Sequence, residues 1–116
     1  MDIEQLREYC LSKMEVTEGF PFGDDTLVFK VKGKIFLIAS LKEPLLQFNL
    51  KCDPEKAIEL REQYDAIQPG YHMNKKLWNT VIINGSLPAK LVKEMIDDSY
   101  LLIIRSLPKK QQTGLL

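Results

Sequence analysis

The stretch LVFKVKGKIFLIAS, residues 27–40, predicts a β-hairpin and thereby decides the fold of the chain. Apolar and lysine side chains alternate along residues 29–32, which is the period-two pattern of a strand. Gly33 supplies the turn because a residue without a Cβ takes a positive φ at no steric cost. Residues 35–39 are apolar throughout, so we expect the second strand at the centre of a sheet.

Simple alternation also predicts which hairpin side chains share a face. It places Val28, Phe36 and Ile38 opposite Leu27 and Leu37, so both faces of the predicted sheet carry apolar residues. Helices are expected to cover one of these faces. The other is then left for a partner if the fold exposes it.

The remaining elements follow from helix caps and turn residues. Asp2 and Gln5 form a capping box before the first helix, and Asp53 followed by Pro54 starts the second. The expected elements are a helix over 2–13, a loop over 15–26, the hairpin over 27–40, a strand over 45–51, a helix from 53, a strand over 78–83 and a helix ending near 106. Short turns between strands require antiparallel pairing.

This pattern predicts an α+β fold with the order α-β-β-β-α-β-α and a single antiparallel sheet packed by helices. Residues 1–107 are expected to form one domain, which is an ordinary size for one core. Residues 108–116 are polar and lack periodicity, so we expect a frayed C-terminal tail.

Composition narrows the class of protein. The 116 residues are 45% hydrophobic and 28% charged, which is ordinary for a globular protein. No apolar run approaches the roughly 18–20 residues that cross a bilayer, and the acidic N-terminus does not look like a signal peptide. We therefore expect a cytoplasmic protein that does not contact membranes.

Charge is balanced overall but sorted along the chain. Lysine and arginine total 16, as do aspartate and glutamate. Residues 26–51 carry five bases and one acid, and residues 66–96 carry four bases and one acid. A fold that brings these two blocks together would have a basic face.

No catalytic, metal or cofactor motif is recognisable. The glycines form neither a GxGxxG fingerprint nor a P-loop, and the single histidine excludes a multi-histidine metal site. Cys10 and Cys52 lie in or beside apolar stretches, which favours buried, reduced thiols. We expect a non-enzymatic protein without a cofactor; a deep pocket joining His72 to Asp24 or Asp25 would favour an enzyme instead.

The hairpin tip is the first feature that suggests a function. Lys30, Lys32 and Lys34 surround one turn, and such a cationic tip can follow the phosphates of a nucleic acid. The alternative is a solvated hairpin whose lysines prevent edge pairing.

The second feature is the segment HMNKKLW, residues 72–78. His72, Asn74, Lys75, Lys76 and Trp78 combine positive charge, hydrogen-bonding groups and the only tryptophan of the chain. Basic residues interleaved with an aromatic can hold a nucleic-acid backbone and stack on a base. Alternatively, the tryptophan anchors a strand in the core, the histidine is structural, and the lysines are loop surface.

Several short motifs together resemble one known family. They are FPFGDD (20–25), FKV (29–31), LKCDP (50–54), PGYHMNK (69–75), WNTV (78–81), GSLP (85–88), DSY (98–100) and LPKK (107–110). Their order and spacing are similar to those of the MmcQ/YjbR family over nearly the whole chain. The resemblance implies a small, stand-alone bacterial α+β domain of a kind described as predicted DNA-binding proteins with a "double-wing" motif. It implies no enzymatic activity.

Two functions therefore stand as hypotheses. The first is a nucleic-acid-binding protein, with DNA as partner, that uses the basic hairpin and the segment 72–78. The second is a module that binds another protein, or a second copy of itself, through the uncovered sheet face.

Overall fold

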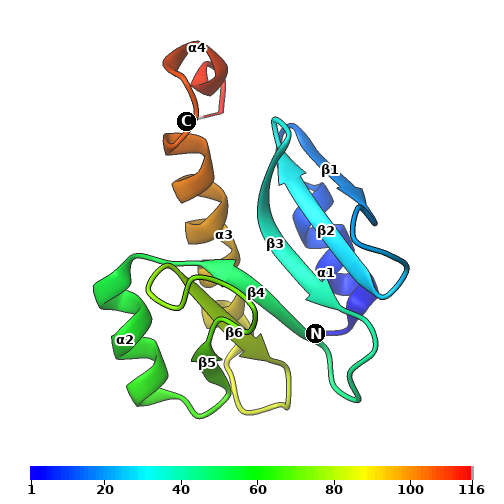
Figure 1. The fold of residues 1–116 in the computed structure, drawn as a ribbon, viewed down its shortest axis with the longest axis vertical. Helices are drawn as coiled ribbons and strands as arrows, with labels where there is room; N and C mark the ends of the chain where they lie inside the picture. Colours follow the sequence, from blue (N-terminus) through cyan, green and yellow to red (C-terminus); the bar gives the residue numbers. More distant parts are fainter. Residues whose placement is uncertain (116) are drawn as a thin grey trace.

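The computed structural model describes residues 1–115, which form one sheet and a layer of helices (Figure 1). The elements are α1 (Ile3–Leu11), β1 (Val16–Gly19), β2 (Thr26–Val31), β3 (Lys34–Ser40), β4 (Gln47–Lys51), α2 (Pro54–Gln63), β5 (Ile67–Pro69), β6 (Trp78–Ile82), α3 (Ala89–Arg105) and α4 (Lys109–Gln112). No helix among them is long and apolar enough to cross a membrane.

All six strands pair antiparallel in the order β1-β2-β3-β4-β6-β5. The α+β class and the order α-β-β-β-α-β-α expected from the sequence are confirmed. Two short edge strands are additions. The loop expected over 15–26 contains β1, and β5 precedes the turn at Gly70. Both lie at the edges of the sheet, and β1 has four residues and β5 has three. Such short strands contain too few residues for the alternation of apolar and polar side chains to be recognised in the sequence.

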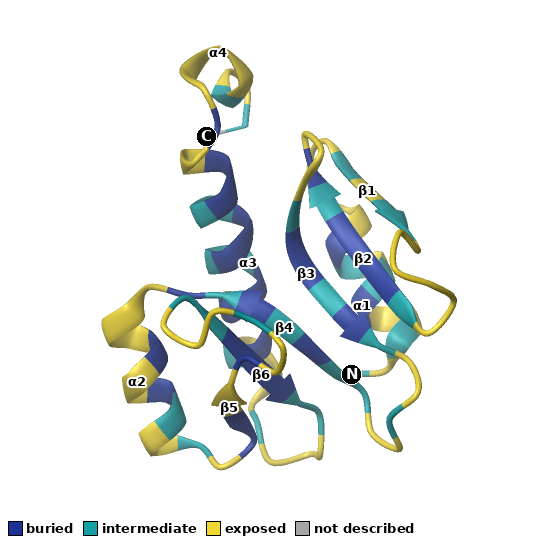
Figure 2. Cartoon of the chain, in the orientation of Figure 1, coloured by how far each residue is buried: buried dark blue, intermediate teal, exposed yellow. Residues whose placement is uncertain are grey.

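The helices α1 and α3 pack on one face of the sheet and bury the core. Figure 1 shows both behind the sheet, and Figure 2 shows buried residues along the strands and along the sheet side of α3. Register places Phe29, Leu37, Leu50 and Val81 in this core, where each is at most 2% exposed. The opposite face is left without a helix, so we call it the open face.

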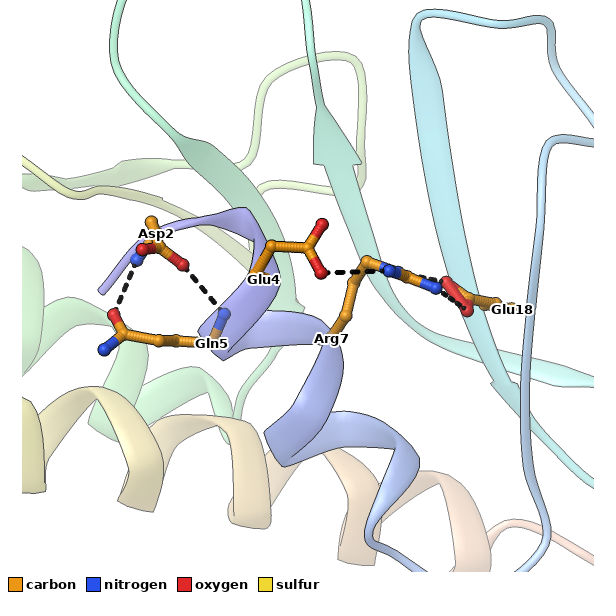
Figure 3. Close-up of polar contacts among 5 residues, drawn as sticks. All are labelled: Asp2, Glu4, Gln5, Arg7 and Glu18. Carbon is orange, nitrogen blue, oxygen red and sulfur yellow. Dashed lines mark hydrogen bonds and ion pairs between the residues drawn. The ribbon is translucent and has the colours of Figure 1, made fainter.

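The predicted start of α1 is confirmed. The side chain of Asp2 accepts a hydrogen bond from the Gln5 backbone N–H at 2.8 Å, and the Gln5 side chain accepts one from the Asp2 N–H at 3.0 Å (Figure 3). Arg7 then joins α1 to β1, because its guanidinium donates two 2.8 Å hydrogen bonds to the carboxylate of Glu18. This bidentate pair fixes the helix against the edge strand.

The expectation that Phe36 lies opposite Leu37 is wrong. The register between β2 and β3 shifts after Phe29, which pairs with Leu37 while Lys30 pairs with Ile35. Phe36 is the extra residue of this β-bulge, and its side chain turns into the core, where its ring meets Tyr100 edge-on at 5.5 Å. The open face therefore loses one of its expected apolar residues.

The C-terminal third differs from two expectations: that Ser86 or Leu87 caps the last helix with Pro88 in its first turn, and that residues 108–116 form a frayed tail. Helix α3 begins at Ala89 with Pro88 at the N-cap, so this proline precedes the first turn and no side chain caps the helix. Residues 109–112, within the expected frayed tail, form the short helix α4, and the side-chain amide of Gln112 donates to the Leu107 carbonyl at 2.7 Å.

Candidate functional site

The open face carries a hollow of about 550 Å³, which is within the usual size range of ligand sites. Its floor comes from strands β2, β3 and β4, and its walls come from the loops before β2, before β4 and before β6. The lining residues are Phe22, Thr26, Ile35, Ile38, Ser40, Lys42, Glu43, Gln47, Phe48, Asn49, Tyr71, His72 and Met73.

The loop before β6 is tied by hydrogen bonds to strand β6 and to α2. Gly70 donates its N–H to the Trp78 carbonyl at 2.9 Å, and a Cβ on this glycine would lie 2.8 Å from the Trp78 Cβ and carbonyl oxygen. Only glycine permits this approach of the two chain segments. From α2, Arg61 donates hydrogen bonds to the carbonyls of Lys75 and Trp78, which closes the other end of the loop.

Two polar side chains of the open face clamp the backbone of Tyr71. Its N–H donates to the Thr80 hydroxyl oxygen at 2.9 Å, and its carbonyl accepts a hydrogen bond from the Asn49 amide at 3.1 Å. The Thr80 hydroxyl in turn donates to the Asn49 side-chain oxygen at 2.6 Å, and the two residues are direct partners across β4 and β6. The three residues form a closed hydrogen-bonded ring.

The clamp presents an aromatic pair at the edge of the hollow. The rings of Tyr71 and His72 lie 4.0 Å apart at an interplanar angle of 51°. Tyr71 is 63% exposed, so its ring is available to a ligand. His72 has a φ of 59°, a left-handed conformation that is uncommon outside glycine and costs backbone strain.

The predicted residues of segment 72–78 take different positions. His72 lines the hollow, whereas Asn74 uses its side-chain oxygen to accept from the Lys76 N–H at 2.9 Å and so shapes its own turn. Lys75 and Lys76 are exposed, and Lys75 donates to the Gly70 carbonyl at 3.3 Å. Trp78 is half-buried at the start of β6 and contributes its backbone to the loop.

The hairpin lysines diverge. Lys30 lies on the open face of β2, and the left-handed residue Lys32 is exposed at the turn, with its ammonium 4.0 Å from a Glu15 carboxylate oxygen. Lys34 points to the helix side, where it donates to the Ser106 hydroxyl at 3.2 Å. Of these three, Lys30 is the one whose strand position faces the same side as the hollow.

The hollow does not join His72 to Asp24 or Asp25, the arrangement that would have favoured an enzyme. His72 lines it together with Glu43, whereas neither Asp24 nor Asp25 does. Cys10 and Cys52 are buried in the core, and burial raises the pKa of the Cys10 thiol to about 12. Within residues 1–115, no group of His, Cys, Asp or Glu is placed to hold a metal ion.

Three residues of this site were missed by the sequence analysis. Tyr71 stands beside His72, and Asn49 and Thr80 each sit within a predicted strand. The available signal was the polar face of residues 47–51, which alternates with Phe48 and Leu50 and thus projects hydrogen-bonding groups away from the core. The pairing of β4 with β6, which brings Asn49 next to Thr80, can be recognised only once the fold is known.

The sequence model of the YjbR family matches residues 11–102. The chain belongs to the YjbR family. The YbdF protein of Escherichia coli O157:H7 is 40% identical over 93 residues, 80% of this chain and 76% of that protein. The YjbR protein of Escherichia coli strain K12 is 30% identical over 112 residues, 97% of this chain and 95% of that one. Both relatives are described as uncharacterized proteins.

Two solved structures share the fold of this chain. A crystal structure of a Deinococcus radiodurans protein superposes with a TM-score of 0.91 at 39% identity, covering 97% of this chain and 86% of that one. A crystal structure from Pseudomonas syringae gives a TM-score of 0.77 at 29% identity, covering 88% and 98%. These similarities show the fold and the family of the chain. The activity has to be argued from the geometry of the site.

Proposed function

We propose that this YjbR-family chain is a non-enzymatic nucleic-acid-binding module, with DNA as its partner, whose interface is the open face and the loop of residues 70–77. The observation that carries the proposal is the clamped Tyr71–His72 pair at the edge of the hollow. A rigid, exposed aromatic shelf supports stacking on bases, since every base offers a π-face.

Charge around the shelf supports the same function. Lys75 and Lys76 follow directly in the loop, Lys42 lines the hollow, and Lys30 lies on the same side of β2. The ion pairs formed among residues 1–115 use none of these four ammonium groups. Lysines without ion-pair partners beside an aromatic shelf suit a polyanion whose backbone passes the shelf while its bases meet the rings.

The test is a fluorescence-anisotropy titration of labelled DNA oligonucleotides, single-stranded and duplex, at several salt concentrations. We expect binding at low salt that weakens as salt rises. The variant Lys75→Glu/Lys76→Glu should bind more weakly and show a shallower salt dependence, because each lost phosphate contact removes a released counterion.

A matched control comes from α4. Lys109→Glu/Lys110→Glu makes the same change in net charge at two exposed lysines of the C-terminal helix, far along the chain from the loop. The proposal fails if no oligonucleotide binds at low salt, or if the two double variants weaken binding equally.

A protein partner is the second candidate, and exposed apolar side chains favour it. Phe20 and Phe22 are 51% and 63% exposed in the loop before β2, and Leu41 and Leu45 are 39% and 48% exposed in the loop after β3. Light scattering coupled to size exclusion tests the simplest case, a second copy of the chain. A dimer that Phe22→Ser dissociates would favour this candidate.

A further inference from the structure

The floor of the hollow contains a row of hydrogen-bonding side chains that the clamp does not use. Thr26 pairs with Ser40 across β2 and β3, and Ser40 pairs with Gln47 across β3 and β4, so the three residues stand side by side on the open face. All three line the hollow. Asn49 and Thr80 in the next row are occupied by Tyr71 and by each other, whereas no hydrogen bond among residues 1–115 uses the side chain of Gln47 or Ser40.

Apolar and aromatic groups surround this polar row. Ile38 is the neighbour of Asn49 across β3 and β4, and Ile35 lies further along the same strand. Phe22 enters from the loop before β2, and the Tyr71–His72 pair enters from the loop before β6. Because β2 and β6 lie on either side of β3 and β4 in the sheet, the rings border the hollow from two sides.

We infer that the hollow receives one unpaired nucleobase of a single-stranded nucleic acid. This inference rests on the proposed nucleic-acid function and names its substrate. A nucleobase has flat apolar faces and an edge of donors and acceptors, which match the rings and the row of Thr26, Ser40 and Gln47. A glutamine amide both donates and accepts, so it can pair with two neighbouring groups on a base edge.

The shape of the site favours a single strand over a duplex. In a duplex the bases are stacked and paired, and their edges are reached by a protein element that projects into a groove. The site here is a hollow, which can only receive a group that projects from the ligand. Unstacked bases of a single strand project in this way, and aromatic side chains then replace the lost base stacking.

Charge complementarity supports the same occupant. Lys42 lines the hollow beside Glu43, Lys30 lies on the open face of β2, and Lys75 and Lys76 follow in the loop that supplies the Tyr71–His72 pair. None of these four lysines has a carboxylate partner among residues 1–115. A strand whose base enters the hollow carries phosphates on both sides of that nucleotide, within reach of separate lysines. A free mononucleotide carries a phosphate on one side only and should bind much more weakly.

The experiment compares four ligands by anisotropy and competition: single-stranded 12-mers of each base, an abasic 12-mer, a duplex, and free mononucleotides. We expect the base-containing single strands to bind at least tenfold more tightly than the other three, with one base preferred. Tyr71→Ala should lower the affinity for these strands about tenfold and leave the abasic strand unaffected. Tyr71→Phe keeps the ring and should bind as the parent does.

Gln47→Ala tests the base edge directly. It should reduce the discrimination between bases and leave the salt dependence unchanged, while Gln111→Ala, at an exposed glutamine of α4, should change neither. Circular dichroism and the melting temperature confirm that each variant is folded. Equal binding of abasic, duplex and base-containing strands would overturn the nucleobase site and leave the proposed function standing. Absence of binding to every strand would overturn both.

Discussion

Ser99 of α3 closes a gap between two strands that the sheet itself leaves open. Leu37 and Leu50 form the pair at one end of the β3–β4 ladder. The Phe36 carbonyl and the Lys51 N–H lie just beyond this pair, where the two strands no longer pair with each other. The Ser99 hydroxyl donates to that carbonyl at 2.6 Å and accepts from that N–H at 2.9 Å. The serine is completely buried, so water does not substitute for it in the native state.

The magnitude of Ser99→Ala follows from this geometry. The substitution leaves the buried Phe36 carbonyl and the part-buried Lys51 N–H without a partner, and an unsatisfied group costs about 1–3 kcal/mol when it is fully buried. Allowing for partial relaxation, we expect the free energy of unfolding to fall by about 3 kcal/mol. With an unfolding entropy of roughly 2.1 cal/mol/K per residue, the melting temperature should fall by about 12 °C.

The assay is urea denaturation followed by tryptophan fluorescence and far-UV circular dichroism, with thermal melts alongside. Ser86→Ala is the matched control, because Ser86 is exposed and its hydroxyl contacts only the nearby Asn84 side chain. We expect the control to remain within about 0.5 kcal/mol of the parent. A Ser99→Ala midpoint equal to that of the control, at an unchanged m-value, would refute the bridging role.

Three further predictions concern the rest of the molecule. Gly70→Ala should destabilise the chain by more than about 1 kcal/mol, because its Cβ would meet the only tryptophan at 2.8 Å; Gly19→Ala, with no atom within 4 Å of its Cβ, is the control in the same thermal melts. The hydrogen bonds from the Arg7 guanidinium lower the pKa of Glu18 in the folded protein below its ordinary value of 4.5. The ion pair therefore stabilises the fold fully above pH 4.5, and this contribution is lost as the pH falls through the pKa of Glu18 in the folded state. Glu18→Gln should therefore flatten the acid limb of an unfolding-against-pH curve, and an unchanged limb would contradict this role. Cys10 and Cys52 are 0% and 8% exposed, and burial raises the pKa of both thiols. A thiol reagent should therefore modify them only at the rate at which the protein unfolds. Rapid labelling of either thiol in the native protein would contradict this and show that the core opens there.

Local chemistry made the central elements predictable. The Asp2–Gln5 capping box, the Asp53–Pro54 helix start and the Gly33 turn each depend on residues within three positions of one another, and all three occur in the structure. The strand expected over 45–51 is present as β4, and the alternation of its residues matches their burial, with Phe48 and Leu50 buried and Gln47, Asn49 and Lys51 half-buried. These signals are short-range, so no knowledge of the fold was needed to recognise them.

Features that depend on distant residues escaped prediction. The bulge at Phe36 shows this best, because strict alternation assigns its side chain to the wrong face. The core accommodates the bulge through Tyr100 and Ser99, which lie more than sixty positions away along the chain. The hollow has the same origin: its walls come from three separate loops, and no one of them suggests a cavity by itself.

The Tyr71 clamp argues for a binding role more strongly than the lysines that first drew notice. A buried tyrosine would stabilise the fold through the area it removes from water, but this ring remains 63% exposed and gains little in that way. The structure nevertheless commits Asn49 and Thr80 to its backbone and accepts a left-handed φ at His72. The strained backbone of His72 and the hydrogen bonds from Asn49 and Thr80 have a physical reason if the aromatic pair must hold its position before a ligand arrives. Such preorganisation reduces the entropy lost on binding. On this reasoning Asn49→Ala should weaken strand binding even though Asn49 itself need not touch the base, because it frees the shelf that Tyr71 and His72 form.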